Sequence, residues 1–124
     1  MQTQRLRILL FGLDPALAGE LKSTLSDHEV VESGMAGSGA AQIAGAAPDV
    51  VFCGSQRQCR EAALRAVALS RPWTPVIVAS RQPETSDWLD ALEAGAVDYC
   101  SAPFEARQIS WILDSSVRNS RRAA

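Results

Sequence analysis

The sequence predicts an α/β protein with one parallel sheet of five strands between two layers of helices. Short unbroken apolar runs rich in β-branched residues alternate with segments in which apolar residues recur every three or four positions. The length of 124 residues fits one domain with one core. A regular alternation of strands and helices implies parallel strands joined by right-handed crossovers.

Three buried strands are expected at residues 8–11, 50–53 and 76–79, which are continuously apolar. Residues 30–33 and 97–101 carry more polar positions, as edge strands do.

The first helix begins with a clear signal. Asp14 is a suitable N-cap, and Pro15 follows at the first helical position. Leu17, Leu21 and Leu25 then recur every four residues, which predicts one apolar stripe facing the sheet.

Four more helices complete the alternation. One covers residues 38–47 and stops before Pro48, and another covers residues 57–69 with Ala63 and Val67 on its inner stripe. The next is capped by Ser86, has Leu89 and Leu92 inward, and closes at Gly95. The last runs from Phe104 to about Val117 and buries one face, made of Ile109, Ile112, Leu113 and Ser116.

These elements fit a flavodoxin-like (βα)5 three-layer sandwich with strand order 2-1-3-4-5. We expect a single domain over residues 1–124, with a core of about 5–118 and a tail at 119–124. In such sheets the functional crevice lies beyond the carboxyl ends of the strands.

Composition excludes several classes of partner. The net charge of −2 and the pI of about 5.3 argue against nucleic acid, and we interpret Arg118, Arg121 and Arg122 as a solvated helix end. No apolar run approaches the ~20 residues that span a bilayer, and no signal peptide is apparent, so a cytoplasmic protein is expected.

Three cysteines are too few to pair completely and show no CxxC spacing. We interpret Cys53, Cys59 and Cys100 as small apolar side chains in a reducing compartment.

Three fragments in order resemble the receiver domains of response regulators. Residues 92–99 (LEAGAVDY) followed by Pro103 and Phe104 are similar to the end of such a domain, where a Lys-Pro-Phe turn follows the fifth strand. Residues 48–51 (PDVV) and 74–80 (TPVIVAS) resemble the entry to the third strand and the fourth strand. The resemblance covers about residues 7–117 and implies a bacterial two-component or phosphorelay pathway.

The resemblance also implies a phosphorylation site. That chemistry needs an acidic pair that binds Mg²⁺, an aspartate that accepts the phosphoryl group, and a lysine. The matching positions are Gly12 and Leu13, Gly54, and Ala102. All four charges are missing, so no bound Mg²⁺, other metal or cofactor is expected. Asp14 would join the acidic pair only after a one-residue shift and is better explained as the helix cap.

Two residues match the family's conformational switch. Ser80 matches the hydroxyl that bonds the phosphoryl group, and Tyr99 matches the aromatic residue that follows it. A strand-end cap and an edge-strand aromatic are the alternatives. Ser55 lies beside the missing acceptor but has no general base, and Arg81 could supply positive charge from the fourth strand.

The surface that reads this switch carries aromatic residues. Trp88, Tyr99 and Trp111 lie on the fourth helix, fifth strand and fifth helix, a face that mediates dimerisation or partner docking in receiver domains. Local packing of both tryptophans over core edges is the alternative. Trp73 is interpreted as a loop aromatic that caps the sheet.

Two functions remain open. The first is a non-phosphorylatable receiver-like signalling module that acts through a protein partner or as a homodimer. The second is a small-molecule sensor that uses the emptied crevice. An enzyme is not expected, because His28 lies in a turn without a nucleophile, and residues 34–39 fit no phosphate-binding loop.

Overall fold

The computed structural model describes residues 5–33, 39–81 and 85–123. The predicted loop at residues 34–39 therefore falls almost wholly outside the described residues.

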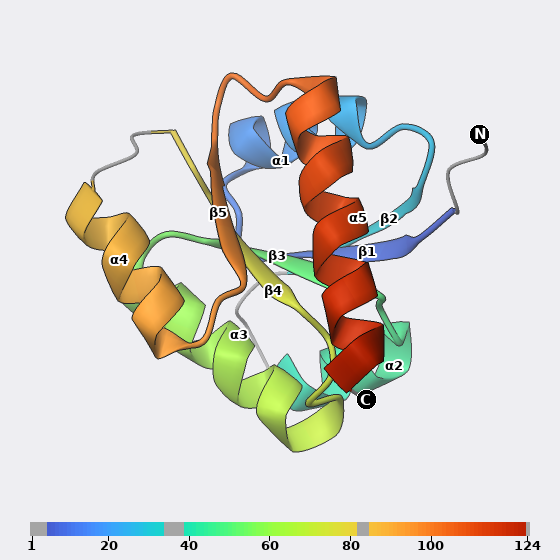
Figure 1. Ribbon diagram of the computed structural model, residues 1–124, viewed down its shortest axis with the longest axis vertical. Coiled ribbons are helices and arrows are strands. Elements are labelled where there is room, and N and C mark those ends of the chain that lie inside the picture. Colours follow the sequence, from blue (N-terminus) through green and yellow to red (C-terminus); the bar gives the residue numbers. More distant parts are fainter. Residues whose placement is uncertain (1–4, 34–38, 82–84, 124) are drawn as a thin grey trace.

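The protein has a single five-stranded parallel sheet in the order β2-β1-β3-β4-β5 (Figure 1). Its strands are β1 (Arg7–Phe11), β2 (Glu29–Ser33), β3 (Val50–Gly54), β4 (Val76–Ser80) and β5 (Asp98–Ser101). The three central strands are buried along almost their whole length, whereas β2 and β5 are partly exposed. The predicted flavodoxin-like order and the assignment of edge strands are confirmed.

Five helices cover the sheet: α1 (Pro15–Thr24), α2 (Gly39–Ala46), α3 (Arg57–Ser70), α4 (Thr85–Ala94) and α5 (Ala106–Ala123). The layers follow from two core clusters. One joins Leu21 of α1 and Ile109 of α5 to one face of the sheet. The other joins Ile43 of α2, Ala63 of α3 and Ala91 of α4 to the opposite face.

The central strands supply both clusters because successive side chains point to opposite faces. Ile8 and Leu10 of β1 belong to the cluster under α1 and α5, whereas Leu9 and Phe11 belong to the cluster under α2, α3 and α4. A strand buried on both faces has no place for polar side chains. Polar chemistry is therefore confined to the strand ends.

The predicted helix signals hold for α1 and α5. The Asp14 Oδ1 atom accepts a hydrogen bond of 2.9 Å from Leu17 N, which is the N-cap interaction expected from the sequence. Ile109, Ile112 and Ser116 of α5 are all buried, as predicted.

The predicted inner face of α4 is wrong. Leu89 is 51% exposed and Leu92 is only half-buried, whereas Ala91 is fully buried. The helix is therefore rotated so that a small residue contacts the sheet. Ser86 lies within α4, whose first residue is Thr85, and is not its cap.

The boundaries of α5 also differ from those predicted. The helix begins at Ala106, two residues after Phe104, and continues to Ala123 through the segment expected to be a tail. The last turns of α5 consist mostly of polar and charged residues, so the sequence has no apolar periodicity there that would predict a helix.

Cys53, Cys59 and Cys100 are all free and buried, as predicted. Burial raises the pKa of the Cys100 thiol to about 12, and it raises the pKa of Cys53 as well. Among the described residues, no helix combines the length and apolarity that crossing a bilayer requires.

The turn before β2 is tied to the start of β1 by the single histidine. Leu6 N donates a hydrogen bond of 3.0 Å to Nδ1 of His28, so this nitrogen is unprotonated. Burial is the largest influence and lowers the pKa of His28 below its ordinary 6.5, although Asp27 and Asp114 act in the opposite direction.

We predict that His28 makes folding stability depend on pH. As the pH falls below 6.5, the unfolded chain takes up a proton before the folded chain does, so the free energy of unfolding falls until the lowered folded-state pKa is passed. A His28→Gln variant cannot titrate and should lose this part of the slope. Urea denaturation of both proteins between pH 7.5 and pH 5, roughly the range over which histidines titrate, measures the difference, and identical pH profiles would contradict it.

Candidate functional site

A crevice of about 530 Å³ opens at the carboxyl ends of β1, β3 and β4. Five of the six predicted pocket residues line it, namely Gly12, Leu13, Asp14, Gly54 and Ser80. The sixth, Ala102, is not part of the lining but is held beside it, since its N–H donates a 2.8 Å hydrogen bond to the backbone oxygen of Ser80. The structure thus brings the positions matched to a receiver's phosphorylation site to one end of the sheet.

Two glycines let the backbone segments of this crevice approach closely. Gly12 has φ of 68°, a left-handed conformation that favours glycine, and its N–H donates to Ser33 O at 2.9 Å. A Cβ atom at Gly54 would lie 3.3 Å from the Gly12 oxygen, closer than ordinary van der Waals contact. Side chains at either position would disturb this arrangement.

Cys59 closes the floor of the crevice from α3. Its Sγ atom donates to Phe11 O at 3.4 Å and lies 3.8 Å from Gly12 O. Burial raises the pKa of this thiol, and a hydrogen bond with the Gly54 backbone offsets the effect only in part. The group is therefore a protonated hydrogen-bond donor, which is a structural role and not that of a nucleophile.

Arg81 gathers the acidic side chains at the mouth of the crevice. Its guanidinium group lies 2.7 Å from Glu20 Oε2 and 3.6 Å from Asp14 Oδ1. All three side chains are about half exposed, so each pair contributes only about 0–1 kcal/mol. Although these ion pairs add little to stability, they fix the position of Asp14 between Arg81 and the start of α1.

The residues present do not fit Mg²⁺. The ion needs oxygen ligands, usually with one or two carboxylates, and the acidic-pair and acceptor positions are Gly12, Leu13 and Gly54. Among the lining residues that the structure describes, Asp14 is the one with a carboxylate, and its Oδ1 already accepts from Leu17 N. In the part of the chain that the structure describes, no group of three His, Cys, Asp or Glu side chains could hold a metal ion.

The two predicted switch residues lie on neighbouring strands. Ser80 is buried at the end of β4 and pairs in register with Ser101 of β5. Tyr99 packs against the core cluster under α3 and α4, so its ring points inward. Its hydroxyl is buried without a hydrogen-bond partner among the described residues. Ser55 also lines the crevice, where the carboxylate among the described lining residues is that of Asp14, already paired with Arg81.

Sequence reasoning missed the contacts that organise the crevice. Arg81 was expected to supply positive charge from the end of the fourth strand, but its ion pair with Glu20 depends on how α1 packs beside that end. Cys59 was expected to be buried, yet its bonds to the end of β1 depend on how α3 sits on the sheet.

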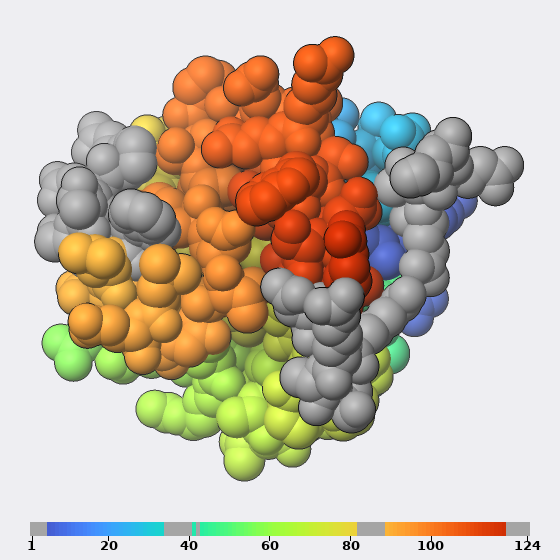
Figure 2. Space-filling view, in the orientation of Figure 1, coloured from blue at the N-terminus to red at the C-terminus, as the bar shows by residue number. Residues whose placement is uncertain are grey.

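The α4–β5–α5 face, defined here by α4, β5, the residues between them and α5, carries exposed apolar side chains. Trp111 is 67% exposed and Val97 is 50% exposed, and the exposed Leu89 of α4 lies on the same face. Figure 2 looks onto this side of the molecule, with α4 in gold, β5 in orange and α5 in red. The side chain of Trp88 lies outside the described residues.

No protein-family model and no curated protein matches the chain. Solved structures do match it. NtrX from Brucella abortus aligns with a TM-score of 0.81 and 24% identity over 97% of this chain, and its receiver domain aligns with a TM-score of 0.76 and 25% identity over 90% of this chain and 98% of its own. A CheY-like response regulator receiver domain protein from Methanospirillum hungatei aligns with a TM-score of 0.76 and 21% identity, covering 98% of this chain and all of its own.

These similarities show the fold. The chain has the architecture of response-regulator receiver domains over nearly its whole length. It spans only 29% of the length of the longer NtrX chain.

We predict that the crevice backbone depends on glycine at position 12. Gly12→Ala should destabilise the fold by about 1 kcal/mol, because a side chain is strained at this positive φ. Gly19→Ala is the matched control, since Gly19 lies within α1 with open space around its Cβ position. It should stabilise the protein by about 0.5–1 kcal/mol. Urea denaturation measures both, and equal effects of the same sign would contradict the strain at Gly12.

Proposed function

We propose that this chain is a receiver-like signalling module that works through protein–protein interaction without being phosphorylated. It would act in the cytoplasm, in a two-component or related phosphorelay pathway, and neither as an enzyme nor as a nucleic-acid or membrane binder. The receiver fold supports the pathway. The observation that carries the proposal is the crevice, in which small or apolar residues replace the acidic pair and the phosphoacceptor.

Phosphoryl transfer to a receiver needs charge at defined positions. A carboxylate attacks the phosphorus atom, and cations stabilise the negative charge on the phosphoryl oxygens. Gly54 offers no nucleophile, and Ala102 offers no cation. Arg81 lies at the mouth of the crevice, but its charge is compensated by Asp14 and Glu20.

Incubation with acetyl phosphate and Mg²⁺ is expected to leave the mass of the intact protein unchanged, because the end of β3 carries no carboxylate that could accept the phosphoryl group. Calorimetry should show no one-to-one binding isotherm for Mg²⁺ at millimolar concentration, the range in which receivers hold the ion through several oxygen ligands. A canonical receiver domain treated in parallel is the positive control. An added phosphoryl group on an acidic side chain of this protein would refute the proposal.

The partner would dock on the α4–β5–α5 face. Large aromatic residues anchor protein interfaces, and exposed apolar side chains gather there from two helices and the segment between them. A second copy of the chain is the simplest partner, because a two-fold contact uses the same patch on both copies. Tyr99 points inward. Among the aromatic side chains of this face that the structure describes, the exposed one is therefore Trp111.

Trp111→Glu is expected to abolish self-association, since it places a charge at the centre of the apolar contact. Leu69→Glu is the matched control, because Leu69 is an equally exposed apolar residue on α3, away from this face. Sedimentation velocity over a range of concentrations should show a dimer for the wild type and the control and a monomer for Trp111→Glu. A wild-type protein that is monomeric at every concentration, or a dimer that survives Trp111→Glu, would contradict docking through this face.

The volume of the crevice favours one alternative, a sensor that holds a small molecule there. A hollow of about 530 Å³ falls within the range of small-molecule sites, and its lining mixes apolar residues with Ser55, Gln56 and Ser80. Thermal-shift measurements against nucleotides and metabolites separate this function from protein docking.

A further inference from the structure

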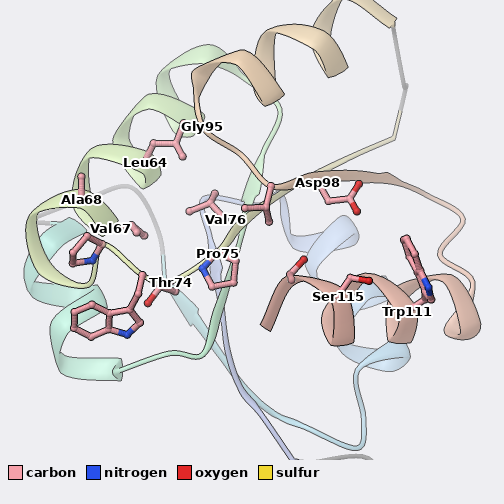
Figure 3. A pocket seen from close by; sticks show the side chains of 14 residues that line it. Leu64, Val67, Ala68, Thr74, Pro75, Val76, Gly95, Asp98, Trp111 and Ser115 are labelled. Carbon is pink, nitrogen blue, oxygen red and sulfur yellow. The ribbon is translucent and has the colours of Figure 1, made fainter. Parts of the chain in front are cut away.

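A second and larger hollow lies at the opposite end of the sheet. A groove of about 730 Å³ opens beside the amino ends of β4 and β5, and it is bounded by the end of α3, the loop before β4 and the outer side of α5. Figure 3 shows Val67 and Thr74 on one side and Trp111, Ser115 and Asp98 on the other, and Trp73 also lines the groove. The groove shares no residue with the crevice described above.

The groove collects the largest exposed apolar side chains of the described protein. Trp73, Val97 and Trp111 are three of the six large hydrophobic residues with substantial exposure, and all three line it. Exposed apolar groups gathered in one concave place mark binding sites more often than scattered ones do. The volume suits a small molecule with one or two rings.

The polar groups of the groove favour a ligand with a positive charge. Asp98 is the only charged residue in the described lining, and it forms no ion pair with any described residue. One of its oxygens, Oδ1, accepts the N–H of Tyr99 at 2.8 Å, which leaves Oδ2 available. The hydroxyl groups of Thr74, Ser115 and Ser116 add neutral hydrogen-bonding partners.

Trp111 adds to this preference. The face of an indole ring attracts cations, and the Arg71 guanidinium carbon already lies 5.3 Å from the centre of the Trp73 ring, so Trp111 is the indole that serves a cationic ligand. The groove thus offers an apolar, aromatic surface next to a carboxylate, without a positive charge in its described lining that would compete for Asp98.

We infer that this groove binds a small molecule that has a flat apolar ring and one cationic nitrogen, such as an aromatic amine or amidine. The ring lies against Trp111, and the cation pairs with Asp98. This inference does not rest on the signalling role proposed above, although the groove and the α4–β5–α5 face share Trp111.

Benzamidine and benzoate test the inference, because they have similar rings and opposite charges. Titration is followed by NMR through the indole N–H signals, which Trp73→Phe and Trp111→Phe variants assign. Benzamidine should shift the signal of Trp111 with saturation, and benzoate should bind about fivefold more weakly, as expected for the loss of one solvent-accessible ion pair.

Asp98→Asn is the decisive variant, since the amide keeps an oxygen for Tyr99 N and loses only the charge. It should weaken benzamidine binding about fivefold and bring it close to that of benzoate. Asp114→Asn, which removes an exposed carboxylate of α5 outside the groove, should leave the affinity unchanged. The absence of a saturable shift at Trp111 would overturn the site. Equal binding of both probes, or no effect of Asp98→Asn, would overturn the choice of a cationic ligand.

Discussion

The burial of β1, β3 and β4 on both faces is the constraint on which the rest of the structure depends. These strands contribute side chains to two core clusters at once, so almost none of their positions can be polar. Each fully buried aliphatic side chain contributes roughly 1.5–3 kcal/mol relative to an exposed one. Substitutions at the ends of the strands leave these cores intact. The fold can therefore keep a receiver's architecture while the chemistry at its carboxyl end changes.

The charged groups near the crevice are arranged differently from those of a phosphorylation site. Two carboxylates about 4 Å apart repel each other by about 4 kcal/mol at an effective dielectric constant near 20, and a metal ion normally offsets that cost. Here Arg81 lies between Asp14 and Glu20, so the acidic groups near the crevice are compensated within the chain.

The backbone of the crevice also limits which side chains it can hold. The positive φ of Gly12 and the 3.3 Å approach to its carbonyl at Gly54 mean that aspartates at both positions would meet strain and crowding. Carboxylates there would need movement of the β1 and β3 ends as well as new side chains.

The sequence predicts the sheet well because each strand carries its own signal. Continuous apolar runs mark β1, β3 and β4, and Asp14 followed by Pro15 marks the start of α1. The inner face of α4 was wrong because its contact residue is Ala91, and a single alanine gives no periodic signal.

The contacts around the crevice and the groove could not be predicted for another reason. They bring together residues distant in the sequence: Arg81 pairs with Glu20, and Trp73 and Trp111 line the same groove. The position of each residue at a strand end follows from the pattern. The distance between two such residues follows only from the packing of the helices.

Trp111 belongs both to the α4–β5–α5 face and to the lining of the groove, and this has a thermodynamic consequence. A partner that covers the indole and a ligand that lies against it use the same surface, so each lowers the affinity of the protein for the other by the same factor. Such competition needs no movement of the sheet and no phosphoryl group. A receiver-like domain with Gly12, Leu13 and Gly54 in its crevice would in this way still have its docking face controlled, from the amino end of the strands instead of the carboxyl end.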